Sequence, residues 1–206
     1  MLLLSCPDCR SDVEFANGRV VCLQPDCGRV FTVYEERIID MPPTRIPSWQ
    51  LSAAETHFQT VEDSYRRLCQ VPFDLGTEGA AWGDIDEGAT EGYLRFLAEQ
   101  AEAAGQLLGS PDANGWIVDV SGGSGYLLRA LSEGWRGALH LEAHLPSLRA
   151  EFNRASRAGL CNMVFVRGSY LRPPLKSGSA SAVLAMDTII RSSHHTDCFF
   201  GTSMPR

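Results

Sequence analysis

The sequence predicts an α/β protein whose main unit is an incomplete parallel sheet of about four strands. A small cysteine-rich β module and a helical arm precede this sheet. Three observations lead to this expectation. Four of the seven cysteines fall in the first 27 residues as two close pairs. A proline-rich and then acidic stretch follows them. From residue 115 onward, short apolar runs alternate with helical patterns, which is typical of parallel sheets.

Composition and charge narrow the function classes. The 206 residues are 44% hydrophobic and 21% charged, as in ordinary globular chains. No stretch approaches the ~20 apolar residues of a membrane span, and the N-terminus lacks a signal-peptide pattern, so we expect a cytoplasmic protein without a membrane partner. The net charge is −7, and residues 55–102 hold 11 acids against three arginines. Such a segment repels a phosphate backbone, so RNA is a disfavoured partner.

The cysteine pairs have the spacing of metal knuckles. The first pair is C-x2-C and the second is C-x4-C, with a hairpin signal at Asn17-Gly18 between them and a third apolar run at Val30–Tyr34 behind them. Two such pairs can deliver four thiolates tetrahedrally to one Zn²⁺. We therefore predict a zinc ribbon over residues 1–42. Its structural zinc would be held by Cys6, Cys9, Cys22 and Cys27.

Two alternatives apply to the same cysteines: four unligated buried thiols, or a redox C-x-x-C pair. Pairing, spacing and the hairpin favour metal, and no βαβ pattern surrounds a redox pair. With only about 40 residues, the core is small, so metal would supply most of the stability. The module resembles the N-terminal zinc ribbon of some bacterial methyltransferases, over residues 2–42. It is also similar to the small zinc-ribbon subunit that activates tRNA and protein methyltransferases. That likeness implies that a protein partner docks on the ribbon. RNA is the less favoured partner.

Residues 43–114 are expected to form a linker and a helical arm. Prolines interrupt residues 41–48, and a capping box at Ser52 predicts a helix over 53–68. Residues 72–92 are rich in Gly, Asp and Glu. They form either a solvated connector with Trp82 packed on the core, or a lid over a pocket. A second amphipathic helix is predicted over 91–108.

Residues 116–131 organise the second half of the chain. Ile117–Val120 reads as a buried strand, residues 121–125 as a turn of small residues, and the helix begins at Tyr126. A strand, a glycine turn and a helix in this order let backbone amides approach a nucleotide-like ligand without an intervening Cβ. Asp119 lies inside the strand, where a carboxylate is costly to bury unless it is paired.

Three further strands are predicted over 137–142, 163–167 and 182–186, with a helix over 145–158. The first of them ends in a carboxylate, Glu142. Asp119 and Glu142 are 23 residues apart, close to the ~20 expected between a glycine turn and the acid that binds ribose hydroxyls.

With its predicted strands and turn in this order, the segment 115–190 resembles class I S-adenosylmethionine-dependent methyltransferases with a type-11 methyltransferase domain. Residues 119–125 look like the Asp-x-Gly-x-Gly-x-Gly loop of that family. The resemblance implies a Rossmann-like fold over 115–206 with S-adenosylmethionine as cofactor. The residues it implies for cofactor binding are Asp119, Ser121, Gly122, Gly123, Gly125, Glu142, Ser169 and Asp187. No general base is identifiable. The chain departs from the family at Ser121, which replaces a glycine, and at Ser169, which replaces an adenine-binding acid.

Other interpretations remain beside this one. An NAD-binding domain competes, although an acid two residues before the first small residue of the turn favours the methyltransferase type. His194, His195 and Cys198 could form a metal cluster, but they lie in an aperiodic tail. The family has seven strands, whereas this chain ends about twenty residues after the fourth. Three hypotheses follow: a methyltransferase acting on a small molecule or protein, a truncated non-catalytic product with an uncovered sheet edge, or a binding module that docks through its ribbon.

Overall fold

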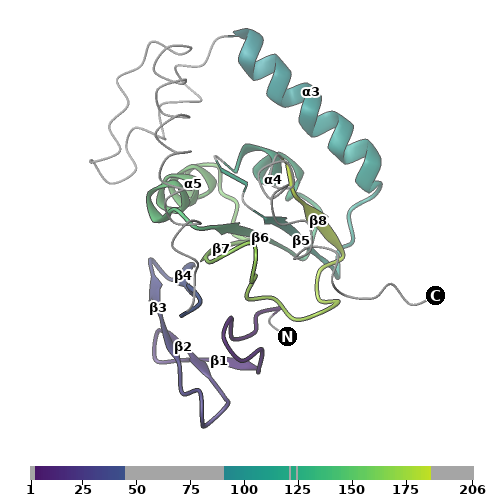
Figure 1. The fold of residues 1–206 in the computed structure, drawn as a ribbon. Helices are drawn as coiled ribbons and strands as arrows, with labels where there is room; N and C mark the ends of the chain where they lie inside the picture. Colours follow the sequence, from purple (N-terminus) through teal and green to yellow (C-terminus); the bar gives the residue numbers. More distant parts are fainter. Residues whose placement is uncertain (1–2, 45–90, 121, 124, 187–206) are drawn as a thin grey trace, which may run out of the picture.

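The computed structural model describes residues 3–44, 91–120, 122–123 and 125–186 (Figure 1). Its strands are β1 (Val13–Ala16), β2 (Arg19–Cys22), β3 (Val30–Tyr34), β4 (Ile38–Asp40), β5 (Trp116–Val120), β6 (Gly137–Glu142), β7 (Met163–Arg167) and β8 (Ala182–Leu184). Its helices are α3 (Glu91–Leu108), α4 (Tyr126–Leu131) and α5 (Leu145–Arg157). The strands of this part of the chain form one eight-stranded sheet in the order β1-β2-β3-β4-β7-β6-β5-β8.

The parallel half of the sheet confirms the predicted fold class. β7, β6, β5 and β8 are parallel neighbours, and β6 and β7 have the predicted bounds. β8 is shorter than predicted and ends at Leu184 rather than at Met186. The helix predicted over 91–108 is α3, with Ala101 buried and Phe96 and Leu107 exposed.

The N-terminal β module (residues 3–44) is antiparallel from β1 to β4. Its first hairpin turns at the predicted dipeptide, where Asn17 and Gly18 have φ angles of 51° and 70°. Two consecutive left-handed residues match the twist of the flanking strands, which explains why Asn-Gly stands there.

The fourth strand of this module was not predicted from the sequence. β4 pairs in parallel with β7, with Ile38 opposite Phe165 and Asp40 opposite Arg167. The two halves therefore share one sheet, and β4 lies along the edge of β7 that does not pair with β6. At the other end, the described residues contain no strand beyond β8.

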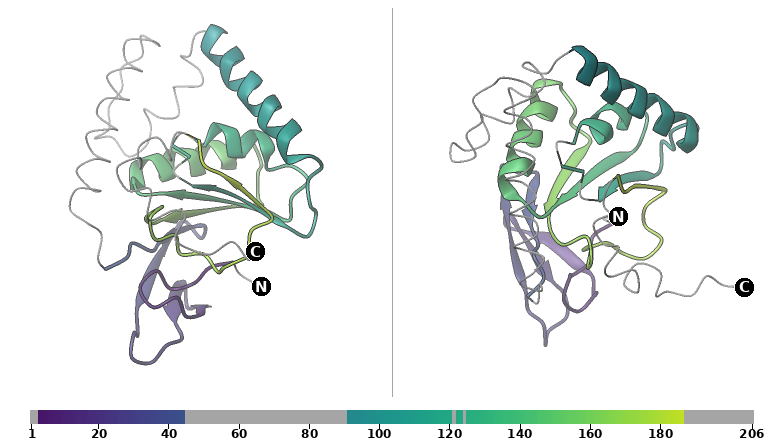
Figure 2. Two further views of the ribbon diagram at one scale, coloured as in Figure 1. Left: turned by 45° about the vertical axis from the view of Figure 1, so that its right-hand side comes forward. Right: turned by 45° about the horizontal axis from the view of Figure 1, so that its top comes forward.

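The two faces of the parallel strands have different covers. On one face, apolar side chains from the strands pack with residues of α4 and α5, such as Leu128 and Leu148. The other face includes Val118, Leu139 and Leu141, and these pack with residues of the N-terminal β module. Figure 2 shows α4 and α5 on one side of the sheet and the N-terminal β module continuing it at the far end. The N-terminal β module thus extends the sheet and also covers one of its faces.

Several predictions fall outside the described residues and stay predictions. They are the helix over 53–68, the loop containing Trp82, and the tail with its His194, His195 and Cys198 cluster. Within the described ranges, no helix combines the length and apolar character needed to cross a membrane.

Candidate functional site

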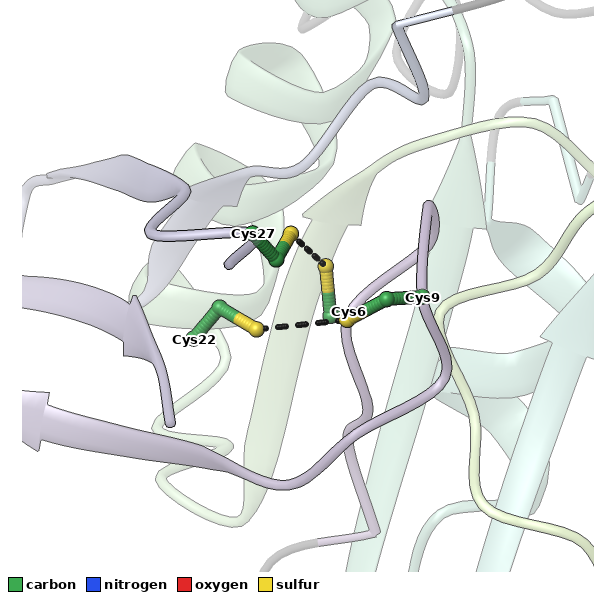
Figure 3. Close-up of side chains that lie close together, drawn as sticks. All are labelled: Cys6, Cys9, Cys22 and Cys27. Carbon is green, nitrogen blue, oxygen red and sulfur yellow. Dashed lines mark hydrogen bonds between the residues drawn. The ribbon is translucent and has the colours of Figure 1, made fainter. Parts of the chain in front are cut away.

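The structure brings the four predicted metal ligands together (Figure 3). All four Sγ atoms lie within 4.8 Å of one another. Cys9 Sγ is 3.4 Å from Cys22 Sγ, and Cys6 Sγ is 3.7 Å from Cys27 Sγ. These separations exceed the ~2.05 Å of a disulfide, so the cysteines form a cluster of free thiols.

Backbone geometry explains why the two pairs converge. Each pair is followed directly by a left-handed residue, Arg10 with φ 67° and Gly28 with φ 55°. The Arg10 amide donates to the Cys6 carbonyl at 2.9 Å, and the Gly28 amide donates to the Gln24 carbonyl at 3.0 Å. Both turns therefore direct their cysteines toward the same point.

In the absence of a positive charge, the cysteines of the cluster differ in how readily they ionise. Burial raises the pKa of Cys6, and it raises that of Cys22 to about 12. Hydrogen bonds from Ser11 lower the pKa of Cys9 to about 6. Four thiolates this close would repel one another without a compensating positive charge, and sulfur donors prefer ions such as Zn²⁺. The donor set fits a closed, four-coordinate metal site.

The first cysteine turn also holds the segment that follows β7. Arg172 Nη2 donates to the Asp8 carbonyl at 2.9 Å, and Arg10 Nη1 donates to the Pro173 carbonyl at 2.5 Å. This segment carries the predicted site residue Ser169, which is buried and whose Oγ accepts from the Leu171 amide at 3.2 Å. The first cysteine turn and the predicted cofactor segment are therefore joined by direct hydrogen bonds.

The glycine turn after β5 is packed directly on buried carboxyl groups. A Cβ at Gly122 would lie 2.1 Å from Asp119 Oδ2. A Cβ at Gly125 would lie 2.4 Å from Glu151 Cδ, and Gly125 has φ 67°. A Cβ at Gly123 would meet no described atom within 4 Å, although its φ is 55°. Gly122 and Gly125 are thus required by close contact with carboxyls. Gly123 is required by its backbone conformation, and this second reason applies to Gly125 as well.

Asp119 is almost fully buried, with 1% of its surface exposed. Burial raises its pKa to about 7, and the carboxyls of Glu142 and Glu151 add to the effect. Among the described residues its Oδ1 has no hydrogen-bond partner. A buried carboxylate oxygen of this kind is an acceptor available to a ligand donor or to a residue of the turn.

Glu142 ends β6 on the same side of the sheet as Asp119. Asp119 is opposite His140 in the ladder, two residues before Glu142, so both acids point to one face. Glu142 Oε1 accepts from the amides of Ala143 at 2.6 Å and His144 at 3.0 Å. These bonds fix the carboxylate at the carboxyl end of its strand, which is where ligands bind in open α/β sheets.

Four titratable side chains beneath the turn were not predicted from the sequence. Glu151 Oε2 accepts from Arg129 Nη1 at 2.5 Å and from Arg154 Nη1 at 3.4 Å. Burial raises the pKa of Glu151 to about 7 against the opposing effect of both arginines. Burial, followed by the same arginines, lowers the pKa of His140 to about 3, so this imidazole is neutral. One feature of the sequence could have indicated this group: Glu151 stands three residues before Arg154, a spacing at which an acid and a base on a helix can pair.

The charges around the turn decide which ligand suits it. Asp119, Glu142 and Glu151 supply three carboxyls, whereas Arg129 and Arg154 are paired with Glu151. Once the carboxyls of Asp119 and Glu151 are ionised, above their pKa values of about 7, a pyrophosphate would meet net negative charge here and a cationic group would be stabilised. In that state the arrangement suits a cationic ligand better than a dinucleotide. Of the predicted site residues, Ser121 and Asp187 lie outside the described ranges.

No protein-family model and no curated protein sequence matches this chain. Solved structures resemble it in fold. Geranyl diphosphate C-methyltransferase from Streptomyces coelicolor A3(2), solved with S-adenosyl-L-homocysteine, is 15% identical with a TM-score of 0.50, over 68% of this chain and 56% of that one. A geranyl diphosphate methyltransferase with GPP and sinefungin is 17% identical with a TM-score of 0.49, over 66% and 54%.

In these comparisons the aligned part spans between 32% and 56% of the other chain. At such low identity the likeness concerns the fold alone. The parallel strand order β7-β6-β5-β8 and the similarity to the Streptomyces coelicolor enzyme both indicate a Rossmann-like fold. The parallel half of this chain has a Rossmann-like α/β fold, like that of the similar geranyl diphosphate C-methyltransferase.

Proposed function

We propose that this chain binds S-adenosylmethionine at the carboxyl ends of β5 and β6 and transfers its methyl group to a small-molecule or protein acceptor. One observation carries the proposal: the glycine turn is packed on the buried carboxyl groups of Asp119 and Glu151. S-adenosylmethionine has a sulfonium and an ammonium group, and both are cations. The net acidity of the chain, −7, favours a small-molecule or protein acceptor over RNA.

Each residue would act by binding and positioning. Asp119 and the amides of the turn would hold the methionine part, and Glu142 would accept hydrogen bonds from the ribose hydroxyls. Ser169, at the end of β7, would border the adenine. The cofactor supplies a methyl group on a sulfonium. The contribution of the chain is to align this donor with the acceptor and to exclude water.

The likeness in fold to a methyltransferase with a TM-score of 0.50 supports this proposal and leaves the acceptor open. The charge of the site supports it independently, because the competing NAD interpretation requires a loop that tolerates pyrophosphate.

Titration calorimetry tests the proposal on the full chain loaded with zinc. We expect binding of S-adenosylhomocysteine and none of NAD. The variant Glu142→Gln should weaken that binding, because a ribose acceptor loses its charge. The exposed Glu99, on the outer surface of α3, gives the matched control Glu99→Gln. A folded sample that binds NAD but not S-adenosylhomocysteine would overturn the proposal.

We also propose that the cysteine cluster holds one structural Zn²⁺ and that the N-terminal β module is a zinc ribbon. The convergence of four Sγ atoms within 4.8 Å supports this. Elemental analysis should find about one zinc per chain. The single variants Cys6→Ser and Cys22→Ser should lose it, and Cys161→Ser, at an exposed cysteine elsewhere, should keep it.

A further inference from the structure

Glu151 lies directly behind the glycine turn, although it belongs to α5. A Cβ on Gly125 would be 2.8 Å from Glu151 Oε1, so the carboxyl lies directly against the backbone of this glycine. The side chain is completely buried. Its Oε2 is bound to Arg129 of α4 and Arg154 of α5, and its Oε1 has no partner among the described residues.

Charged groups from α4, α5 and β5 act on Glu151, and Glu142 of β6 acts on Asp119. Arg129 belongs to α4, Arg154 to α5, Asp119 to β5 and Glu142 to β6, where the neutral His140 also lies. At about pH 8 and above, where Asp119 and Glu151 are both ionised and where the calorimetry is carried out, this buried group has one excess negative charge. Because water is excluded, such a charge acts on a nearby ligand with little screening.

We infer that Glu151 is a specificity-determining residue whose charge makes the site prefer the sulfonium cofactor to its neutral thioether product. The inference rests on the proposed function. S-adenosylmethionine and S-adenosylhomocysteine make the same contacts through adenine, ribose and amino acid. They differ by one methyl group and one positive charge at sulfur. A buried negative charge behind the turn therefore stabilises the first more than the second, which favours release of the product.

Opposite changes of charge test the inference. Glu151→Gln keeps the shape of the side chain and removes its charge. Arg154→Gln removes one neighbouring positive charge and leaves Glu151 bound to Arg129. The ratio of the dissociation constant of S-adenosylhomocysteine to that of S-adenosylmethionine is measured by calorimetry without acceptor, and thermal melting checks the fold. We expect the ratio to fall about fivefold in Glu151→Gln and to rise in Arg154→Gln.

A purely structural role would weaken both ligands equally and leave the ratio unchanged in both variants. The double variant Glu151→Gln/Arg154→Gln restores the net charge and should return the ratio toward that of the unmodified protein. Glu99→Gln, which makes the same change of charge at an exposed position, should leave the ratio unchanged. If Glu151→Gln does not fold, Arg154→Gln decides: an unchanged or lowered ratio overturns the inference.

The failure of this inference differs from the failure of the proposed function. If the unmodified protein binds both ligands and the ratio of their dissociation constants is the same in Glu151→Gln, the inference alone is wrong. If the unmodified protein binds neither ligand, both are wrong.

Discussion

Ile38 of the N-terminal β module and Phe165 of the parallel sheet are ladder partners, and both side chains are fully buried in one apolar cluster. Since the ladder continues across this pair, the N-terminal β module with its cysteine cluster and the parallel sheet belong to the same hydrogen-bonded unit. A change at one should be felt in the stability of the other.

Removal of the metal should therefore lower the melting temperature of the whole described fold. We expect one cooperative transition in the zinc-loaded protein and a single transition at lower temperature after treatment with a chelator. The physical reason is that the ladder formed by β4 and β7 transmits the loss. Scanning calorimetry measures it. Two transitions, of which only one responds to chelation, would show that the halves unfold separately.

Ile39 tests the same junction without touching the metal ligands. Its side chain is 1% exposed and packs with Val166, so Ile39→Ala leaves a cavity at the joint. We expect a loss of about 2–5 kcal/mol in the free energy of unfolding, measured with urea. Val30→Ala, at a half-exposed position of β3, is the control and should cost less than about 1 kcal/mol.

The contact of Gly125 with Glu151 gives a prediction for ligand binding. Gly125→Ala should weaken binding of S-adenosylhomocysteine about tenfold or more, because the new Cβ collides with the carboxyl and displaces the turn. Gly159 has a similar φ of 72°, and a Cβ there would meet no described atom within 4 Å, so Gly159→Ala imposes the backbone strain alone. Equal effects of the two substitutions on binding would contradict this explanation.

Asp119 should make stability depend on pH in an unusual direction. Its pKa rises from 3.8 to about 7 on folding. Between these values the folded protein keeps a proton that the unfolded chain has released. The contribution of Asp119 is thus fully present below about pH 4 and is lost as the pH rises through 7.

The variant Asp119→Asn isolates this effect from the opposite one of His140, whose pKa falls to about 3. Relative to the unmodified protein without cofactor, the variant should gain roughly 2–4 kcal/mol between pH 4.5 and pH 8. Urea unfolding at both pH values measures this difference. A variant that loses stability relative to the unmodified protein as the pH rises would reverse the sign and refute the assignment.

Local signals in the sequence account for much of the fold. The Asn17-Gly18 turn, β6 and β7 stand where they were predicted, because turn chemistry and apolar runs are encoded within a few residues. β4 was not predicted because a strand of only three residues has no pattern of its own in the sequence. Its partner strand, β7, lies 127 positions further along the chain.

The candidate site shows the same division. The cysteine spacing predicted a cluster that the structure brings together, since both turns are local. Asp119 and Glu142 were predicted from the glycine turn and its distance to the second acid, and they remain predicted site residues. Glu151 was not, because its importance arises only when α5 is packed against the turn. A helical acid among arginines looks like a surface residue until the tertiary contact is known.

The pairing of β4 with β7 also has a consequence for biosynthesis. The N-terminal β module is synthesised before the parallel strands, and its cysteine turns and hairpins can form from neighbouring residues alone. Its last strand must wait until residues 163–167 have been translated. During that interval Ile38 and Ile39 are exposed on a nascent chain, which makes them candidates for chaperone contact. Late closure of this ladder would then be the step that commits the newly made protein to its final structure.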